Sequence, residues 1–433
     1  MPAGEQLALL FFPGGGLPKA QAVLRMFFRY GLSTSGPICV SAAHFVASLI
    51  FLHLLQQVEF GQFSFLLIVV PFCLSATGAL LGAPAALTRG KDEATANAEI
   101  ATLQKISLVF SGISGIAVGA LMYSTQAHAD TAFVFGLYGA ASVLRGFARS
   151  LGNVRAQLLR VAGSDMLYSV LLVAGLTALI EVGRLTMPNA AVVLALAVTA
   201  SFVPFGWTYA REMTAAVRKQ TLGLYARMWQ DVTRWSLLGV VLTELTANAH
   251  AYFVTFLSGP KAFGLLALGA LFMRPASLVL SALPDIDQPL MTRRLAQGDI
   301  KGALRVVKEF KTAASVVLAA TVILSLAIMT WFPRLMLRKG YDGTEVMIVL
   351  VLWIAITALR TIRTPVAVFF QALGKYSALA RVSAWSSVAS LTVTLALLLT
   401  FGPIASLGGV LAGEVAIVLV LFPMMHSWRR QHA

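Results

Sequence analysis

The chain has 433 residues, of which 58% are hydrophobic and only 12% are charged, a composition far from that of a soluble globular protein. The net charge is +15, but the basic residues lie between long apolar segments, which favours a membrane surface and argues against a nucleic-acid-binding domain. Both cysteines, Cys39 and Cys73, lie inside apolar runs, which argues against a disulfide framework or a cysteine-rich metal site.

The apolar runs predict an all-α polytopic membrane protein. A helix needs about 20 apolar residues to cross roughly 30 Å of hydrocarbon at about 1.5 Å per residue. Residues 1–35 are expected to form a cytoplasmic segment with an amphipathic stretch and no cleaved signal peptide. Twelve candidate transmembrane runs follow in chain order: 36–56, 63–88, 106–124, 131–144, 163–182, 187–209, 236–257, 262–283, 313–332, 346–359, 383–400 and 404–426.

The distribution of basic residues predicts the orientation of these helices. Of the 33 Lys and Arg residues, 27 lie at the termini or in the connections after even-numbered helices, and five lie on the opposite side. The remaining one, Arg274, falls inside the eighth helix. Cytoplasmic loops of membrane proteins are enriched in Lys and Arg, so both termini are expected to face the cytoplasm of a bacterium, with the chain in its inner membrane.

Two halves of the sequence resemble each other around their second helices. Phe60-Gly61 is matched by Phe263-Gly264 and Pro71 by Pro275, at offsets of 203 and 204. A duplication with an even number of helices gives two halves of the same orientation, related as parallel repeats. We therefore expect a six-helix bundle over 36–210, an amphipathic cytoplasmic linker over 211–235, a second six-helix bundle over 236–427 and a cytoplasmic tail over 428–433.

Local motifs add a family resemblance to this architecture. A Leu-Leu-x-x-x-x-Phe-Gly-x-Phe pattern covers 54–63, and second-half counterparts lie at 257–264, Pro275, 288–289, 293–299 and 370–375. These stretches resemble the polysaccharide (O-antigen and exopolysaccharide) flippase branch of the multidrug/oligosaccharidyl-lipid/polysaccharide (MOP) exporter superfamily. The resemblance implies two six-helix bundles around a V-shaped cavity. It also implies undecaprenyl-diphosphate-linked oligosaccharide as cargo, for polysaccharide biosynthesis.

An intramembrane arginine is the first candidate for binding the diphosphate of such a cargo. An unpaired charge at the centre of a membrane helix costs about 2.5–3.5 kcal/mol on insertion scales, so Arg274 is expected to face protein or water. Glu244 lies at a similar depth on the seventh helix, and the two could meet. A structural ion pair and a pair that phosphate breaks during transport both remain open.

Two polar stripes are further candidates for lining the cavity. Glu244, Asn248 and Tyr252 recur every four residues on the seventh helix, and Ser41, His44 and Ser48 share one face of the first helix. Hydrogen bonding between helices is the alternative to substrate contact for these residues. His44 could also couple transport to a proton gradient.

Arginines and acids near the cytoplasmic side complete the candidate site. Arg145 and Arg149 near the end of the fourth helix are matched by Arg360 and Arg363 near the end of the tenth, and both pairs could capture a diphosphate at the cytoplasmic mouth. The orientation rule alone also explains arginines there. The intramembrane acids Asp165 and Glu414 could bind a coupling proton or Na⁺.

These features favour a transporter that flips a lipid-linked oligosaccharide by alternating access, with membrane lipids and polysaccharide polymerase machinery as other partners. No large outer loop, P-loop or zinc-protease motif is present, so we expect no enzyme, no metal site and no cofactor beyond H⁺ or Na⁺ coupling. A cation-coupled multidrug exporter of the same superfamily is the main alternative. A lipid II flippase is another, although that family typically has fourteen helices.

Overall fold

The computed structural model describes residues 17–88, 91–218, 223–333 and 341–432. Within these ranges the chain is built of helices, and eleven of them are long and apolar enough to cross a membrane. One further pair of helices, bent by 64°, raises the number of spans to twelve when it is taken as one. The expected all-α membrane fold with about twelve spans is therefore confirmed.

The first half contains six spans that follow one another with short connections. Its first helix, α2, includes both the predicted first span and part of the segment that was expected to precede it. The helices of this half are α2 (Leu17–Leu54), α3 (Gln57–Thr77) with η1 (Gly78–Gly82) and α4 (Ala83–Ala86), α5 (Glu93–Ser124), α6 (Ala129–Val154), α7 (Leu158–Glu181), and α8 (Met187–Ala200) with η2 (Val203–Phe205) and α9 (Gly206–Arg218).

A linker and the second half follow. The linker consists of α10 (Gly223–Met228) and the π-helix η3 (Trp229–Thr233), which leads directly into the next span. The helices of the second half are α11 (Arg234–Ser258), α12 (Pro260–Phe272), α13 (Arg274–Ala296), α14 (Ile300–Trp331), α15 (Gly343–Ala372), α16 (Tyr376–Phe401), and η5 (Ile404–Ser406) with α17 (Leu407–His432).

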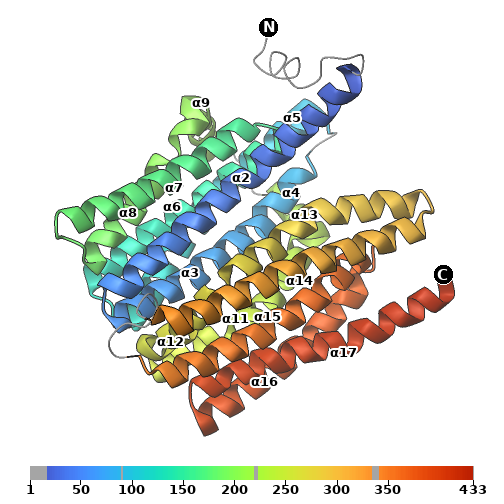
Figure 1. Cartoon of the computed structure of the whole chain (residues 1–433). Coiled ribbons are helices and arrows are strands. Elements are labelled where there is room, and N and C mark those ends of the chain that lie inside the picture. Colours follow the sequence, from blue (N-terminus) through green and yellow to red (C-terminus); the bar gives the residue numbers. More distant parts are fainter. Residues whose placement is uncertain (1–16, 89–90, 219–222, 334–340, 433) are drawn as a thin grey trace.

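The same helix pairs pack together in both halves. In the first half α2 packs on α7, α5 on α6, α6 on α8 and α7 on α8; in the second half α11 packs on α16, α14 on α15, α15 on α17 and α16 on α17. The two halves lie side by side, and α2 starts on the side of the molecule where α17 ends (Figure 1). This correspondence confirms the duplication into two parallel six-helix bundles.

The halves touch mainly through α3, which packs on α11 and α12. Gly61 near the start of α3 lies against the backbone of Pro260, and a Cβ atom at Gly61 would overlap the Pro260 carbonyl. Gly264 lies in turn against Gly61 and the Gln57 carbonyl. The matched glycines of the two repeats therefore bring the halves into backbone contact at the end of the bundle away from the termini.

Glycines spaced four residues apart also allow close helix packing within each half. Gly115 and Gly119 on α5 pack against α6, where Gly136 faces Gly115, and Gly409 lies against Thr394 on α16. A Cβ atom at Gly78 would meet no described atom within 4 Å, whereas one at Gly82 would lie 3.3 Å from the Ser150 Oγ. Gly78 instead begins η1, a π-helix, which widens the end of this span.

Candidate functional site

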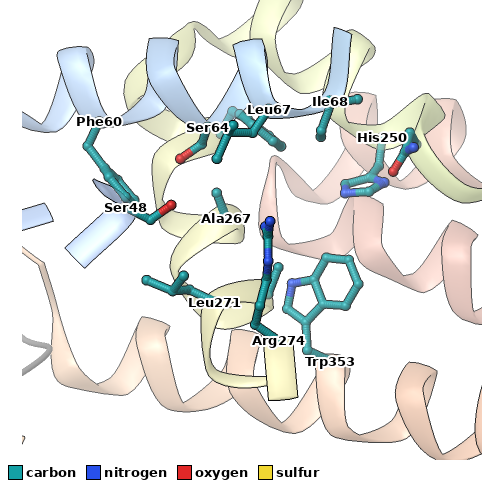
Figure 2. A pocket seen from close by; sticks show the side chains of 13 residues that line it. Ser48, Phe60, Ser64, Leu67, Ile68, His250, Ala267, Leu271, Arg274 and Trp353 are labelled. Carbon is teal, nitrogen blue, oxygen red and sulfur yellow. The ribbon is translucent and has the colours of Figure 1, made fainter. Parts of the chain in front are cut away.

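A cavity of about 160 Å³ lies between the two halves. Its wall contains side chains from both bundles, and Figure 2 shows Arg274 extending into the middle of it. The lining is mostly apolar, with a few polar groups that converge on the interior, as is typical of a ligand site. The lining residues are Ser48, Phe60, Ser64, Leu67, Ile68, Asn248, His250, Phe263, Ala267, Ala270, Leu271, Arg274 and Trp353.

Arg274 lies at a break in the predicted eighth helix. The span predicted over 262–283 is broken into two helices: α12 ends at Phe272, α13 begins at Arg274, and their axes differ by 64°. Pro275 at the second position of α13 has no N–H to donate to the preceding turn, so the helical hydrogen-bond ladder is interrupted there. Arg274 therefore occupies the first position of a half-helix whose N-terminus carries a partial positive charge.

No acidic partner neutralises Arg274 within the described part of the chain. The pair expected between Arg274 and Glu244 is absent there, because Glu244 accepts hydrogen bonds from Asn248 Nδ2 at 3.0 Å and from the Tyr252 hydroxyl at 2.9 Å. Similar depth on two helices does not by itself produce an ion pair, because the two side chains must also point toward each other. Arg274 is left as a half-buried cation that faces the cavity.

The polar stripe on α11 does share one face, as its spacing predicted. Glu244, Asn248 and Tyr252 are joined by the two hydrogen bonds to the Glu244 carboxylate. Of the three, Asn248 lines the cavity beside Arg274. The stripe thus forms one hydrogen-bonded unit, with an amide at the cavity wall and a carboxylate one turn away.

The stripe on α2 divides between two cavities. Ser48 is buried, donates to the His44 carbonyl at 2.7 Å and lines the central cavity. His44 lines a second cavity of about 60 Å³ inside the first half, where its Nε2 lies 2.8 Å from the Tyr168 hydroxyl. Ser41 is half-buried and lines neither cavity.

The arginines of the first half form a buried cluster around Asp165. The Asp165 side chain is fully buried and pairs with Arg145 at 2.5 Å and with Arg149 at 2.8 Å. Arg145 also donates to Ser164 at 3.0 Å and lies over the Tyr168 ring at 4.8 Å. Both arginines line the second cavity with His44, so this cluster of two cations and one anion carries a net positive charge at a cavity wall.

The second half repeats this arrangement with an acid from a different helix. Arg360 on α15 donates to Glu414 on α17 at 2.7 Å, and Arg363 pairs with the same carboxylate. Glu414 is buried, whereas the two arginine side chains are about a quarter exposed. Each pair of arginines thus holds one acid.

The expected position of the arginines at helix ends is wrong. The fourth predicted span continues to Val154 as α6, and the tenth continues to Ala372 as α15. Arg145 therefore lies about 13 Å, and Arg360 about 18 Å, inside the respective helix end at about 1.5 Å per residue. Because each of these arginines is paired with an acid, a membrane helix can contain it, and the helices continue beyond these positions.

Four residues of the two cavities were not predicted from the sequence, namely His250, Trp353, Tyr138 and Tyr168. His250 and Trp353 line the central cavity with their rings edge to face, and the two tyrosine hydroxyls lie 3.0 Å apart in the first half. A signal for His250 was present, because it lies near the polar stripe of α11 at nearly the repeat offset from His44. The other three are aromatic residues in apolar runs, which carry no signal in a single sequence.

No protein-family model and no curated protein matches the sequence. Solved structures do match the fold. A multidrug resistance MATE family transporter of the MOP superfamily, in an inward-facing conformation, has a TM-score of 0.64 at 14% identity, over 93% of this chain and 95% of that chain. The lipid II flippase MurJ, in an inward closed conformation, has a TM-score of 0.66 at 12% identity, over 91% and 87%.

A third structure, the MATE multidrug transporter DinF-BH, has a TM-score of 0.60 at 17% identity and covers 96% of each chain. All three comparisons extend over nearly the whole chain. At these identities the likeness shows the fold and leaves the cargo open. The chain is a multi-pass helical membrane protein with the fold that MATE transporters of the MOP superfamily and MurJ share.

Proposed function

We propose that the chain is a transporter that moves undecaprenyl-diphosphate-linked oligosaccharide from the cytoplasmic to the outer leaflet of the bacterial inner membrane by alternating access. The observation that carries the proposal is Arg274, a cation without a described acidic partner in the cavity between the halves. Guanidinium groups bind phosphate oxygens with two parallel hydrogen bonds. The half-helix N-terminus at Arg274 adds further affinity for an anion.

The two arginine clusters give the diphosphate a route toward Arg274. Arg145 with Arg149, and Arg360 with Arg363, each exceed their single acid by one positive charge. Partial exposure of Arg149, Arg360 and Arg363 leaves room for a second anion. We infer that the head group passes these clusters on its way from the cytoplasm, while Asn248 and Ser48 offer hydrogen bonds to sugar hydroxyls.

The contact between the halves fits one state of such a cycle. Gly61 and Pro260 follow closely after the ends of α2 and α11, so their backbone contact lies at the end of the molecule opposite to the start of α2 and the end of α17 (Figure 1). With the termini in the cytoplasm, as the Lys and Arg distribution predicts, this contact closes the outer side. An inward-facing MATE structure also has a higher TM-score with this chain than an outward-facing one, 0.64 against 0.58.

The test is the leaflet distribution of lipid-linked oligosaccharide in a strain from which the gene is deleted. We expect the lipid to accumulate on the cytoplasmic side, the wild-type gene to relieve this, and Arg274→Ala to fail although folded protein reaches the membrane. Arg274→Lys keeps the positive charge but lacks the planar guanidinium that donates two parallel hydrogen bonds, so it should restore part of the transport. Arg184→Ala is the matched control, because Arg184 is exposed and is predicted to lie on the side of the membrane opposite to the cytoplasm. Normal transport by Arg274→Ala would contradict the proposed role.

A cation-coupled multidrug exporter is the second candidate, and Glu244 is the observation that favours it. Its carboxylate accepts two hydrogen bonds but has no cationic partner among the described residues. A cationic compound could bind there. If the deletion strain accumulates no lipid but becomes sensitive to cationic compounds, and Glu244→Gln fails to protect it, this candidate replaces the first.

A further inference from the structure

His250 is a buried histidine in the wall of the central cavity that the proposed transport does not yet use. It lies on α11 with 2% of its surface exposed, and its Nδ1 has no hydrogen-bond partner in the described part of the chain. The ring packs against Trp353 at 5.7 Å between centroids and against Phe263 at 6.4 Å. Buried polar atoms are normally hydrogen-bonded, so an unpaired imidazole nitrogen at a cavity marks a place for a water, a proton or a ligand.

Figure 2 shows the His250 ring beside the Trp353 ring, on the side of the cavity toward which the Arg274 side chain extends. Both residues line the same cavity. The imidazole is the side chain whose ordinary chemistry binds and releases a proton near neutral pH. Its place next to an anion-binding arginine therefore links proton binding to the charge of the cargo.

The charged groups around His250 are two arginines and two acids, and Arg274 is the one that shares its cavity. Arg274 enters the cavity from the start of α13, and Arg360 lies about two turns beyond Trp353 on α15, paired with Glu414 of α17. On α11 itself Glu244 is the titratable neighbour, and it is occupied by Asn248 and Tyr252.

The remaining neighbours contribute no charge. Helix α16 contacts α11 through the Ser387 and Ser390 hydroxyls, and α2, α3 and α12 add only Ser48, Ser64 and apolar groups to the cavity. A proton on His250 would therefore face the cation of Arg274, which has no acidic partner among the described residues.

We propose that His250 binds one proton when a diphosphate-bearing head group enters the cavity, and releases it when the head group leaves. This rests on the proposed function, because the anion supplies the compensating charge. The step is a proton transfer from a hydronium ion of the aqueous phase: one O–H bond breaks, one N–H bond forms at the unprotonated ring nitrogen, and a water molecule is left. In a poorly hydrated cavity the attraction between imidazolium and phosphate is strong, so anion and proton bind together.

Binding of the two ligands must then be reciprocal. If one proton accompanies each head group, the affinity for the head group changes by up to tenfold per pH unit, rising as the pH falls. The occupied cavity would also carry one negative charge fewer than the lipid alone.

The experiment measures proton uptake by the full-length chain in detergent when it binds a short-chain polyprenyl-diphosphate-linked monosaccharide. This probe is a diphosphate diester, which has no group that titrates near neutral pH, so any proton taken up is bound by the protein. A pH-indicating dye in weak buffer reports uptake, and affinity is measured between about pH 6 and about pH 8. We expect about one proton per bound probe, and an affinity that falls with rising pH.

His250→Gln should bind the probe without proton uptake and with an affinity independent of pH. His250→Asn is the second variant, in case glutamine perturbs folding, which size-exclusion chromatography checks. His53→Gln is the control, because His53 is an exposed histidine near the end of α2 that lines neither cavity, and it should keep the uptake.

Persistent uptake in both His250 variants or absent uptake in the wild type would overturn the proposal, and so would loss of uptake in His53→Gln. The proposed function fails by a different result, namely that the wild type does not bind the probe at any pH or that Arg274→Ala binds it normally. The two failures are therefore distinguishable.

Discussion

Removing the acid from the arginine cluster of the first half should strongly destabilise the protein. Asp165→Asn keeps the shape of the side chain but leaves the charges of Arg145 and Arg149 without an anion. The Asp165 side chain is fully buried and that of Arg145 is 9% exposed, whereas Arg149 is 28% exposed and can turn partly toward water. Breaking a buried pair costs about 3–5 kcal/mol of the free energy of unfolding. Because Arg149 is partly exposed, we expect a loss of about 3 kcal/mol for Asp165→Asn.

A double-mutant cycle separates the ion pair from other effects of the substitution. Arg145→Gln alone should also destabilise, because it removes the contacts with Asp165, Ser164 and Tyr168. The double variant Asp165→Asn with Arg145→Gln leaves no charge buried without a partner, so we expect it to be more stable than the sum of the single effects by about 2 kcal/mol. Arg149→Gln should cost only about 1 kcal/mol, since its charge is partly solvated.

The assay is reversible unfolding of the purified chain in mixed detergent micelles, followed by far-ultraviolet circular dichroism. A loss below about 1 kcal/mol for Asp165→Asn would refute the reasoning, because it would mean that water or another group solvates the arginines. A coupling energy near zero would refute it as well. Transport coupled to H⁺ or Na⁺ through Asp165 remains a prediction, and it requires that both arginines release the carboxylate during the cycle.

Three further predictions concern the backbone. Gly61→Ala should push the halves apart at Pro260 and increase labelling of a cysteine placed at the exposed Ser258, whereas the control Gly78→Ala, whose Cβ meets no described atom, should leave labelling unchanged. Pro275→Ala restores a backbone donor and should straighten the bend between α12 and α13, so binding of a polyprenyl diphosphate should weaken several-fold in a folded protein; unchanged affinity would show that the bend is not needed. Gly409→Ala should lower the free energy of unfolding by about 1–3 kcal/mol, because its Cβ would overlap the Thr394 backbone, and an unchanged denaturation midpoint would contradict this packing.

The fold could be predicted from the sequence because it depends on length and charge distribution alone. Apolar length sets the number of spans, and the alternation of Lys and Arg predicts their orientation across the membrane. Helix ends were less predictable where a charge lies inside a span. Arg145 and Arg360 were expected near helix ends because they are charged, yet their acids on α7 and α17 allow α6 and α15 to continue past them.

The candidate site was predictable in its components and not in its pairings. The hydrogen bonds within the α11 stripe follow from helical spacing, so Glu244, Asn248 and Tyr252 could be grouped correctly. Pairing between helices depends on the rotation of each helix about its axis, which a single sequence does not specify. That is why Arg274 was matched to Glu244, and why the partners of Asp165 and Glu414 could not be named.

The bend at Arg274 has no counterpart in the first half, although the proline is duplicated. Pro71 lies inside α3, which continues without a break from Gln57 to Thr77, and the residue before it is the buried Val70. The cation that we propose as the anchor of the cargo thus belongs to one bundle alone. A head group bound to Arg274 would stay fixed relative to the second bundle. Opening and closing of the cavity would then be a movement of the first bundle relative to the bound head group.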